Sequence, residues 1–133
     1  MIEREFDASD KALQSVMGFV EEELESIGCP MKVSMQISVC VEEIFVNIAH
    51  YAYRGTAGKM KLAVIPEEDG ISLRFSDSGK PFNPLSKEDP DITLSAEDRQ
   101  IGGLGIFMVK KTMDDVQYEF ENGQNILTIK KKF

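Results

Sequence analysis

The stretch from Val39 to Tyr53 constrains the fold more than any other part of the chain. Its apolar residues recur at the three- and four-residue spacing of a helix that packs against a core, and they are Val41, Ile44, Phe45, Ile48 and Ala52. Glu43, Asn47 and His50 stand at i, i+4 and i+7 and share a second, polar face. The stretch therefore predicts an amphipathic helix with a carboxylate and a carboxamide one turn apart.

The polar face of this helix has two explanations. A carboxylate and a carboxamide one turn apart can share a ligand, and asparagine is a mediocre helix former whose place in mid-helix asks for a reason. On this helix alone, however, a solvated surface explains the polar side chains more simply than a ligand site does. Other stretches of the chain are needed to decide between the two.

Helical and strand periods alternate along the rest of the chain. Helical spacing predicts a first helix between the N-cap candidate Ser9 and Gly28, and a third helix that opens at Gly102–Gly105 and runs to Met113. Alternating or continuous apolar runs predict strands at 2–6, 59–66, 71–75, 116–120 and 125–129. Residues 67–70 and the Asn122-Gly123 pair indicate two hairpin turns.

These elements fit one domain. A chain of 133 residues can bury a real core and has the length of a single domain, so we expect residues 1–133 to form one unit. Hairpins outnumber possible parallel crossovers in this order of elements. We therefore expect an α/β two-layer sandwich, in which a mixed, mostly antiparallel sheet carries three helices on one face.

Charge and composition narrow the function. The net charge of -8 argues against nucleic acid, whose phosphates need clustered Lys and Arg, whereas a nucleotide can still bind if a metal ion or backbone N–H groups offset the repulsion. Cys29 and Cys40 form no C-x-x-C pair, so no zinc site is expected. The N-terminus lacks the apolar segment of a signal peptide, and no apolar run approaches the roughly 20 residues of a membrane helix. We expect a cytoplasmic protein that contacts neither membrane nor nucleic acid.

Residues 85–101 form a long polar connection that contains Pro90 and shows no periodic pattern. A loop of that length inside a compact domain is unusual and often serves as a lid over a functional site. The alternative is a surface loop with no such role.

Three stretches carry residues that can serve a nucleotide. Asn47 offers a neutral oxygen that suits Mg²⁺, and Glu43 can accept a proton from an attacking hydroxyl or water. The Asp77 carboxylate can accept a hydrogen bond from an exocyclic amino group such as that of adenine, while Gly79 lets the backbone approach the ring. Gly102–Gly105 opens a helix whose backbone N–H groups can bind phosphate. Taken singly, D-x-G is usually a turn and GGLG usually a helix start.

Together, and in this order, the three stretches resemble a known set. E-x-x-x-N at 43–47, D-x-G-x-P-F-N-P at 77–84 and G-G-L-G at 102–105 look like the N, G1 and G2 boxes of the GHKL ATPases, a superfamily that includes histidine kinases and gyrase. Within it, the chain resembles the small anti-sigma-factor serine/threonine kinases, through NIAHYAY after the first motif, Arg99 before the glycines and MVKKTMDDVQYE after them. The resemblance implies a Bergerat-type ATP-binding fold over nearly the whole chain.

The resemblance implies roles for the residues of the first two motifs. Glu43 would be the general base that activates the acceptor hydroxyl, and Asn47 would be the Mg²⁺ ligand. Asp77, helped by Gly79, would bind the adenine amino group. His50 stands where the group often has a histidine, and we expect it to pack or to form a hydrogen bond.

The resemblance also implies roles for the third motif and the residues before it. The phosphates would lie against the glycine-rich segment, which consists of Gly102, Gly103, Leu104 and Gly105. Residues 85–101 would be the ATP lid, and Arg99 within them would contact the phosphates or a protein partner.

We expect this chain to have the function of the small anti-sigma-factor serine/threonine kinases. Its members use ATP and Mg²⁺ to phosphorylate a serine on an anti-sigma-factor antagonist, and they bind a sigma factor, often as homodimers. The alternative is a catalytically weak, ATP-dependent protein-binding switch of the same fold, although a pure binder has no need of Glu43. A histidine-kinase catalytic domain is less expected, because no dimerisation and phosphoacceptor helix precedes the motifs. The acidity and the lack of a second domain argue against a DNA-dependent ATPase.

Overall fold

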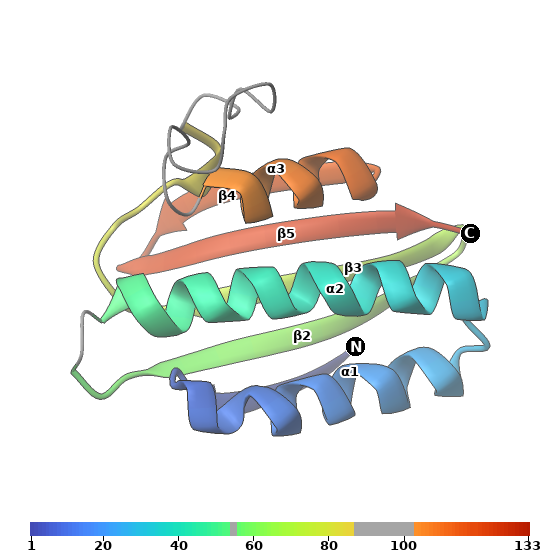
Figure 1. Ribbon diagram of the computed structural model, residues 1–133, viewed down its shortest axis with the longest axis horizontal. Helices are drawn as coiled ribbons and strands as arrows, with labels where there is room; N and C mark the ends of the chain where they lie inside the picture. Colours follow the sequence, from blue (N-terminus) through green and yellow to red (C-terminus); the bar gives the residue numbers. More distant parts are fainter. Residues whose placement is uncertain (54–55, 87–102) are drawn as a thin grey trace.

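The computed structural model describes residues 1–53, 56–86 and 103–133, and within them a helical layer covers one face of a single sheet (Figure 1). The strands are β1 (Ile2–Asp7), β2 (Lys59–Glu67), β3 (Gly70–Asp77), β4 (Asp115–Glu121) and β5 (Gln124–Lys132). The helices are α1 (Leu13–Ser26), α2 (Met31–Asn47) and α3 (Gly103–Thr112), with the short segments η1 (Asp10–Ala12), η2 (Ile48–Ala52) and η3 (Pro84–Ser86). The predicted α/β two-layer sandwich is confirmed.

The strands lie in the order β1-β2-β3-β5-β4, and every pairing among the described strands is antiparallel. The mostly antiparallel sheet is therefore confirmed, while the parallel pair that a mixed sheet would contain is absent from this part of the chain. Two of the four pairings, β2–β3 and β4–β5, are tight hairpins. In the second, Asn122 and Gly123 have φ angles of 53° and 76°, the positive values that a type I′ turn needs at both positions.

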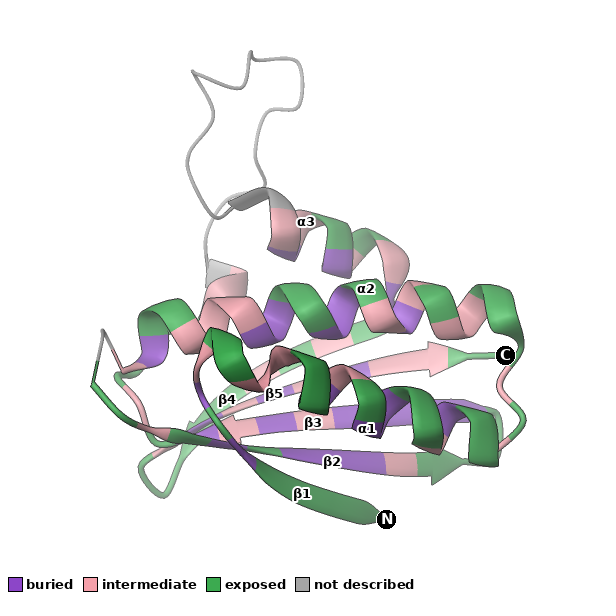
Figure 2. Cartoon of the chain, turned by 60° about the horizontal axis from the view of Figure 1, so that its bottom comes forward, coloured by how far each residue is buried: buried purple, intermediate pink, exposed green. Residues whose placement is uncertain are grey.

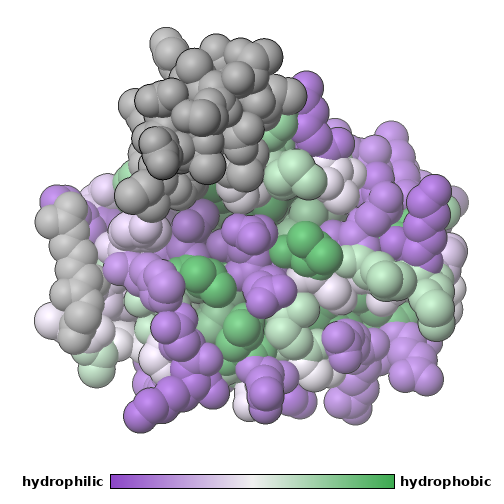
Figure 3. Space-filling model, in the orientation of Figure 1, coloured by the Kyte–Doolittle hydropathy of each residue, from purple (hydrophilic) through white to green (hydrophobic). Residues whose placement is uncertain are grey.

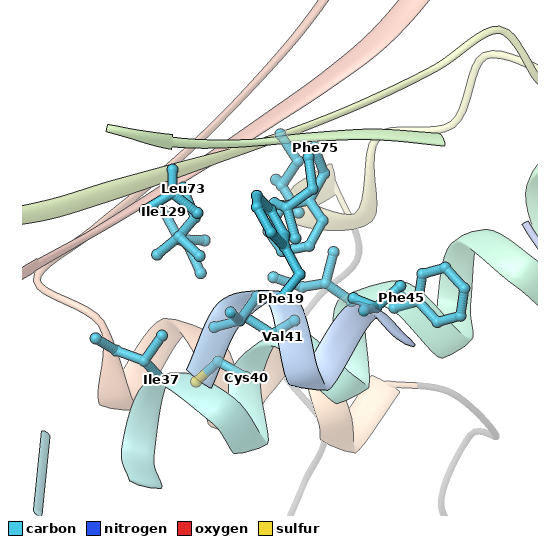
Figure 4. Close-up of a cluster of buried hydrophobic side chains, with 14 of the residues drawn as sticks. Phe19, Ile37, Cys40, Val41, Phe45, Leu73, Phe75 and Ile129 are labelled. Atoms are coloured by element: carbon cyan, nitrogen blue, oxygen red, sulfur yellow. The ribbon is translucent and has the colours of Figure 1, made fainter. Parts of the chain in front are cut away.

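The core lies between the helices and the side of the sheet that faces them (Figure 2). Alternate residues of β2 and β3 are at most 2% exposed, and they are Met60, Leu62, Val64, Ile71, Leu73 and Phe75. They pack against apolar side chains of α1 and α2 that include Phe19, Val41 and Phe45 (Figure 4). Because burying each large apolar side chain contributes roughly 1.5–3 kcal/mol, this cluster fixes α2 on the sheet. The apolar face predicted for 39–53 is confirmed.

The helix that carries Glu43 and Asn47 changes geometry directly after the second of them. α2 ends at Asn47, and η2 continues as a π-helix through Ala52. π-helical segments are rare and frequently occur at functional sites. The predicted helix through residue 53 is therefore present nearly in full, with its last turn wider than an α-helical one.

One local expectation was wrong. Ser9 precedes η1 rather than α1, which begins at Leu13, and the Ser9 side chain makes no capping hydrogen bond. The lysine-rich end of the chain belongs to β5, which is an interior strand between β3 and β4. Lys131 donates from Nζ to the carbonyl oxygen of Thr112, 2.8 Å away, at the end of α3 where helix carbonyls lack intrahelical partners.

The outer side of the helical layer is mainly hydrophilic, with hydrophobic residues scattered over it (Figure 3). Along α2 the exposed apolar side chains are those of Met31, Met35 and Val39. Among the described helices, none combines the length and the apolar character that crossing a bilayer requires.

Candidate functional site

A pocket of about 480 Å³, including its open mouth, lies between the end of the α2–η2 helix, the sheet and the start of α3. Two of the predicted site residues, Asn47 and Asp77, line it. The rest of the wall is largely apolar and aromatic, and includes Ile44, Ile48, Tyr51, Phe75, Phe82, Ile106, Tyr118 and Leu127. A mostly apolar cleft with a few convergent polar groups is the usual form of a small-molecule site.

Asp77 supplies the buried carboxylate of this pocket. It is the last residue of β3 and is only 6% exposed. Its Oδ1 accepts hydrogen bonds from the backbone N–H of Gly79 at 2.9 Å and from the side-chain amide of Asn125 at 3.0 Å. Among the described residues, no group donates to Oδ2. Asp77 therefore presents Oδ1 to the protein, while Oδ2 has no donor among the described residues.

Gly79 brings the turn after β3 against the end of the η2 helix. A Cβ atom at Gly79 would overlap the carbonyl oxygen of Ala52, and the next residue, Lys80, donates its backbone N–H to that same oxygen at 2.8 Å. We expected the glycine to allow approach to a base. In the structure, Gly79 makes its close approach to Ala52, which joins the helix that carries Asn47 to the turn that follows Asp77.

Glu43 and Asn47 lie on the same face of the helix, where Glu43 is exposed and Asn47 is half-buried. Asn47 lines the pocket, whereas Glu43, one turn earlier, does not and is exposed. The carboxylate of Glu43 lies instead against Gly105, where a Cβ atom would overlap its Oε2. Because Gly105 belongs to the first turn of α3, the structure brings the first and third motifs together at this point.

The third motif is described only in part. Gly103 and Leu104 begin α3, so the backbone N–H groups of its first turn have no intrahelical acceptors. Leu85 belongs to η3, while Arg99, Gly102 and most of the expected lid at 85–101 lie outside the described residues.

Asn125 and Tyr118 belong to the pocket, although the motifs did not single them out. Asn125 is 7% exposed, and its Oδ1 accepts from the backbone N–H of Phe82 at 3.1 Å and from the Tyr118 hydroxyl. Burial raises the pKa of Tyr118, so its hydroxyl keeps the proton that it donates. The sequence held one signal: Asn125 shares the strand parity of Leu127 and Ile129, which predicts a buried polar side chain.

His50 lies away from this pocket and joins two parts of the fold. Its Nε2 is 2.8 Å from Oδ1 and 3.1 Å from Oδ2 of Asp10, which ties η2 to η1. The hydrogen-bonding role expected for His50 agrees with this contact. The pair is exposed and does not line the wall that contains Asn47 and Asp77.

The sequence matches the family described as the histidine kinase-like ATPase domain over residues 6–131. Among curated proteins, it is 28% identical over 99 residues to the serine-protein kinase RsbW of Listeria monocytogenes, covering 71% of this chain and 63% of that protein. It is 27% identical over 118 residues to RsbW of Bacillus cereus, covering 86% and 68%. The chain thus spans less than two thirds of the length of the Listeria relative.

Solved structures share the fold at low sequence identity. One contains the RsbU and RsbW domains of Rv1364c from Mycobacterium tuberculosis, with a TM-score of 0.65 and 14% identity over 99% of this chain and 32% of that one. Another is the catalytic domain of the histidine kinase ThkA, with a TM-score of 0.53 and 15% identity over 99% of this chain and 97% of that one. The two-layer architecture therefore recurs in proteins of low sequence identity to this chain.

Proposed function

The chain belongs to the histidine kinase-like ATPase domain family, and from this we propose that it is a Mg-ATP-dependent protein serine/threonine kinase that acts in the cytoplasm as an anti-sigma factor. Its substrate would be a serine on an anti-sigma-factor antagonist, and it would also bind a sigma factor, as a homodimer. The relatives named serine-protein kinase support the reaction.

One observation carries the proposal. Asn47 and Asp77 face a single pocket, while Glu43 meets Gly105 at the start of α3. A nucleotide needs an acceptor for its base at one end and a helix N-terminus for its phosphates at the other. Asp77 would serve as the acceptor and the start of α3 as the helix N-terminus, and Asn47 lines the same pocket as Asp77.

The donor set suits Mg²⁺ held together with phosphates. Within the described part of the chain, no three His, Cys, Asp or Glu side chains gather as a metal cage. Mg²⁺ commonly takes only one or two protein oxygens and completes its shell with phosphate and water, so the Asn47 side-chain oxygen would hold it. When bound, the ion would supply charge neutralisation at the phosphates.

The chain's own residues would do the remaining work. Asp77 would accept a hydrogen bond from the adenine amino group. The backbone N–H groups at the start of α3, including those of Gly103 and Gly105, would bind phosphate oxygens. Glu43 would take the proton of the serine hydroxyl as that oxygen bonds to the γ-phosphorus. The bond from the γ-phosphorus to the β–γ bridging oxygen breaks at the same time, and ADP leaves with that oxygen.

The test is label transfer from γ-labelled ATP in the presence of Mg²⁺ to a candidate antagonist protein. Label on one serine, lost when that serine is replaced by alanine and lost with Glu43→Gln, would support the kinase. ATP binding that is normal by calorimetry, with no transfer to any antagonist encoded beside this chain, would favour the ATP-dependent binding switch. Absence of ATP and ADP binding at millimolar concentration would overturn both.

A further inference from the structure

We propose that Asn125, braced by Tyr118, is a positioning residue that fixes Asp77 for recognition of the 6-amino group of adenine without touching the base itself. The inference rests on the proposed ATP site and adds to it the origin of base specificity. Both side chains line the pocket, and both come from strands that carry none of the three motifs.

The amide of Asn125 has every hydrogen-bonding position occupied within the protein. Its Nδ2 donates to Oδ1 of Asp77 and to the carbonyl oxygen of Lys80, each at 3.0 Å, with the carbonyl of Gly79 at 3.5 Å. Its Oδ1 accepts from the N–H of Phe82 and the hydroxyl of Tyr118. An asparagine amide has two N–H donors and two acceptor lone pairs, so none is left for a ligand.

This saturation fixes which way the amide points. A flipped amide would turn an N–H group toward the N–H of Phe82 and an oxygen toward the Asp77 carboxylate and the Lys80 carbonyl, which exchanges three favourable contacts for unfavourable ones. The Tyr118 hydroxyl adds to the observed orientation by donating to Oδ1 of Asn125. Asn125 therefore acts on a bound base only through the groups that it holds.

The groups that it holds define the part of the pocket where a base would lie. The Asn125 amide donates to Oδ1 of Asp77 and leaves Oδ2 of Asp77 available. Its hydrogen bonds to the backbone of residues 80 and 82 fix the segment that forms the adjacent wall of the pocket. A buried site built to accept an N–H rejects an analogue that presents an oxygen instead, because its acceptor is then left unpaired. Asn125 thus sets the geometry on which discrimination between a 6-amino and a 6-oxo purine depends.

The test compares ATP with inosine triphosphate, which differs by a 6-oxo group, using calorimetry of the full chain with Mg²⁺. Asn125→Asp keeps an acceptor for Phe82 and Tyr118 but sets a second carboxylate against Asp77. We expect the ratio of ATP to inosine triphosphate affinity to fall by about tenfold or more, the value of a hydrogen bond to a charged group. Thr128→Asp is the matched control, since it adds the same charge to β5 opposite Arg74, off the pocket, and should leave the ratio unchanged.

Tyr118→Phe is the second variant, and it settles the question if Asn125→Asp does not fold. It removes one hydroxyl that donates to Asn125 and should lower the same ratio several-fold, with little change in melting temperature. A ratio equal to wild type in a folded variant of either residue would overturn the positioning role. If the residue had a purely structural role, its replacement would lower the affinities for both nucleotides by the same factor. That result would also overturn the positioning role. Failure of the wild-type chain to bind either nucleotide would overturn the proposed function instead.

Discussion

Gly105 lies against the carboxylate of Glu43, so closely that a Cβ atom at Gly105 would overlap Oε2. The obstacle is the end of a flexible side chain, so Gly105→Ala should displace Glu43 and leave the fold intact. Because a misplacement of about 1 Å at a reacting group can cost 10²-fold, we expect phosphoryl transfer to fall by about 10- to 100-fold. Label transfer at saturating ATP measures the effect.

The control for this change is Gly18→Ala in the middle of α1, where a Cβ atom meets nothing within 4 Å. It should stabilise the chain by roughly 0.5–1 kcal/mol, because alanine loses less backbone entropy in a helix than glycine does. Wild-type transfer by Gly105→Ala would show that the position of the Glu43 carboxylate does not matter to the reaction.

Asn47→Ala should remove the magnesium dependence of ATP binding. If the Asn47 oxygen is the protein's Mg²⁺ ligand, the affinity for ATP measured with Mg²⁺ should drop to near the affinity measured with a chelator. Gln36→Ala is the matched control, because it deletes another carboxamide from α2 at a position outside the pocket wall. An undiminished gain in affinity from Mg²⁺ in the Asn47 variant would remove this residue from the metal site.

Asp77→Asn should reduce the preference for adenine nucleotides. The buried carboxylate accepts at Oδ1 from Gly79 and Asn125, and an amide in its place would turn a donor toward one of these donors or toward the base. We expect the ratio of ATP to GTP affinity to fall by about tenfold or more. Asp115→Asn, an exposed aspartate on β4, serves as control. An equal ratio of ATP to GTP affinity in wild type and Asp77→Asn would contradict the base contact.

Much of the fold could be predicted from the sequence, because a strong periodic pattern of apolar residues indicates which side chains are buried. The alternation in 59–66 and 71–75 and the helical spacing in 39–53 correspond to core residues such as Leu62, Leu73 and Phe45. The Asn122-Gly123 turn was predictable for a similar reason, since few residue pairs accept positive φ at both positions.

The parts that could not be predicted depend on contacts between distant segments. The motifs marked Asp77, but nothing local to it indicates that Asn125, 48 residues later, holds its Oδ1. The D-x-G motif marked Gly79, but nothing local to it indicates its close contact with Ala52. Lys131 contacts Thr112 because β5 lies inside the sheet, between β3 and β4. The local sequence pattern does not reveal the order of the strands.

Glu67 links the β2–β3 turn to β5 and should contribute to stability in a pH-dependent way. The hydroxyl of Ser72 and then the ammonium of Lys130 lower the pKa of Glu67 below its ordinary value of 4.5. The folded chain therefore holds this carboxyl proton more weakly than the unfolded chain, and the stabilisation is complete above pH 4.5 and lost as pH falls through the lowered pKa.

Glu67→Gln should consequently lower the melting temperature at neutral pH and flatten its decline in acid. Thermal melts from neutral to acidic pH would measure the difference between the two curves, which should close as the pH falls. Glu68→Gln, in the same turn, is the control and should follow wild type. A constant gap between Glu67→Gln and wild type at every pH would rule out the linkage.

Lys131 anchors the far end of α3, whose first turn carries the glycines. Its side chain is 17% exposed, and its Nζ donates to the Thr112 carbonyl at 2.8 Å and lies 4.0 Å from Oδ1 of Asp114. Lys131→Met keeps the apolar stem but leaves a helix-terminal carbonyl without its charged donor, which should cost about 1–2 kcal/mol in urea unfolding. Lys132→Met, one residue further along the same strand and exposed, should cost less than about 0.5 kcal/mol. Equal losses in the two variants would mean that removing any lysine charge, rather than the contact with Thr112, accounts for the effect.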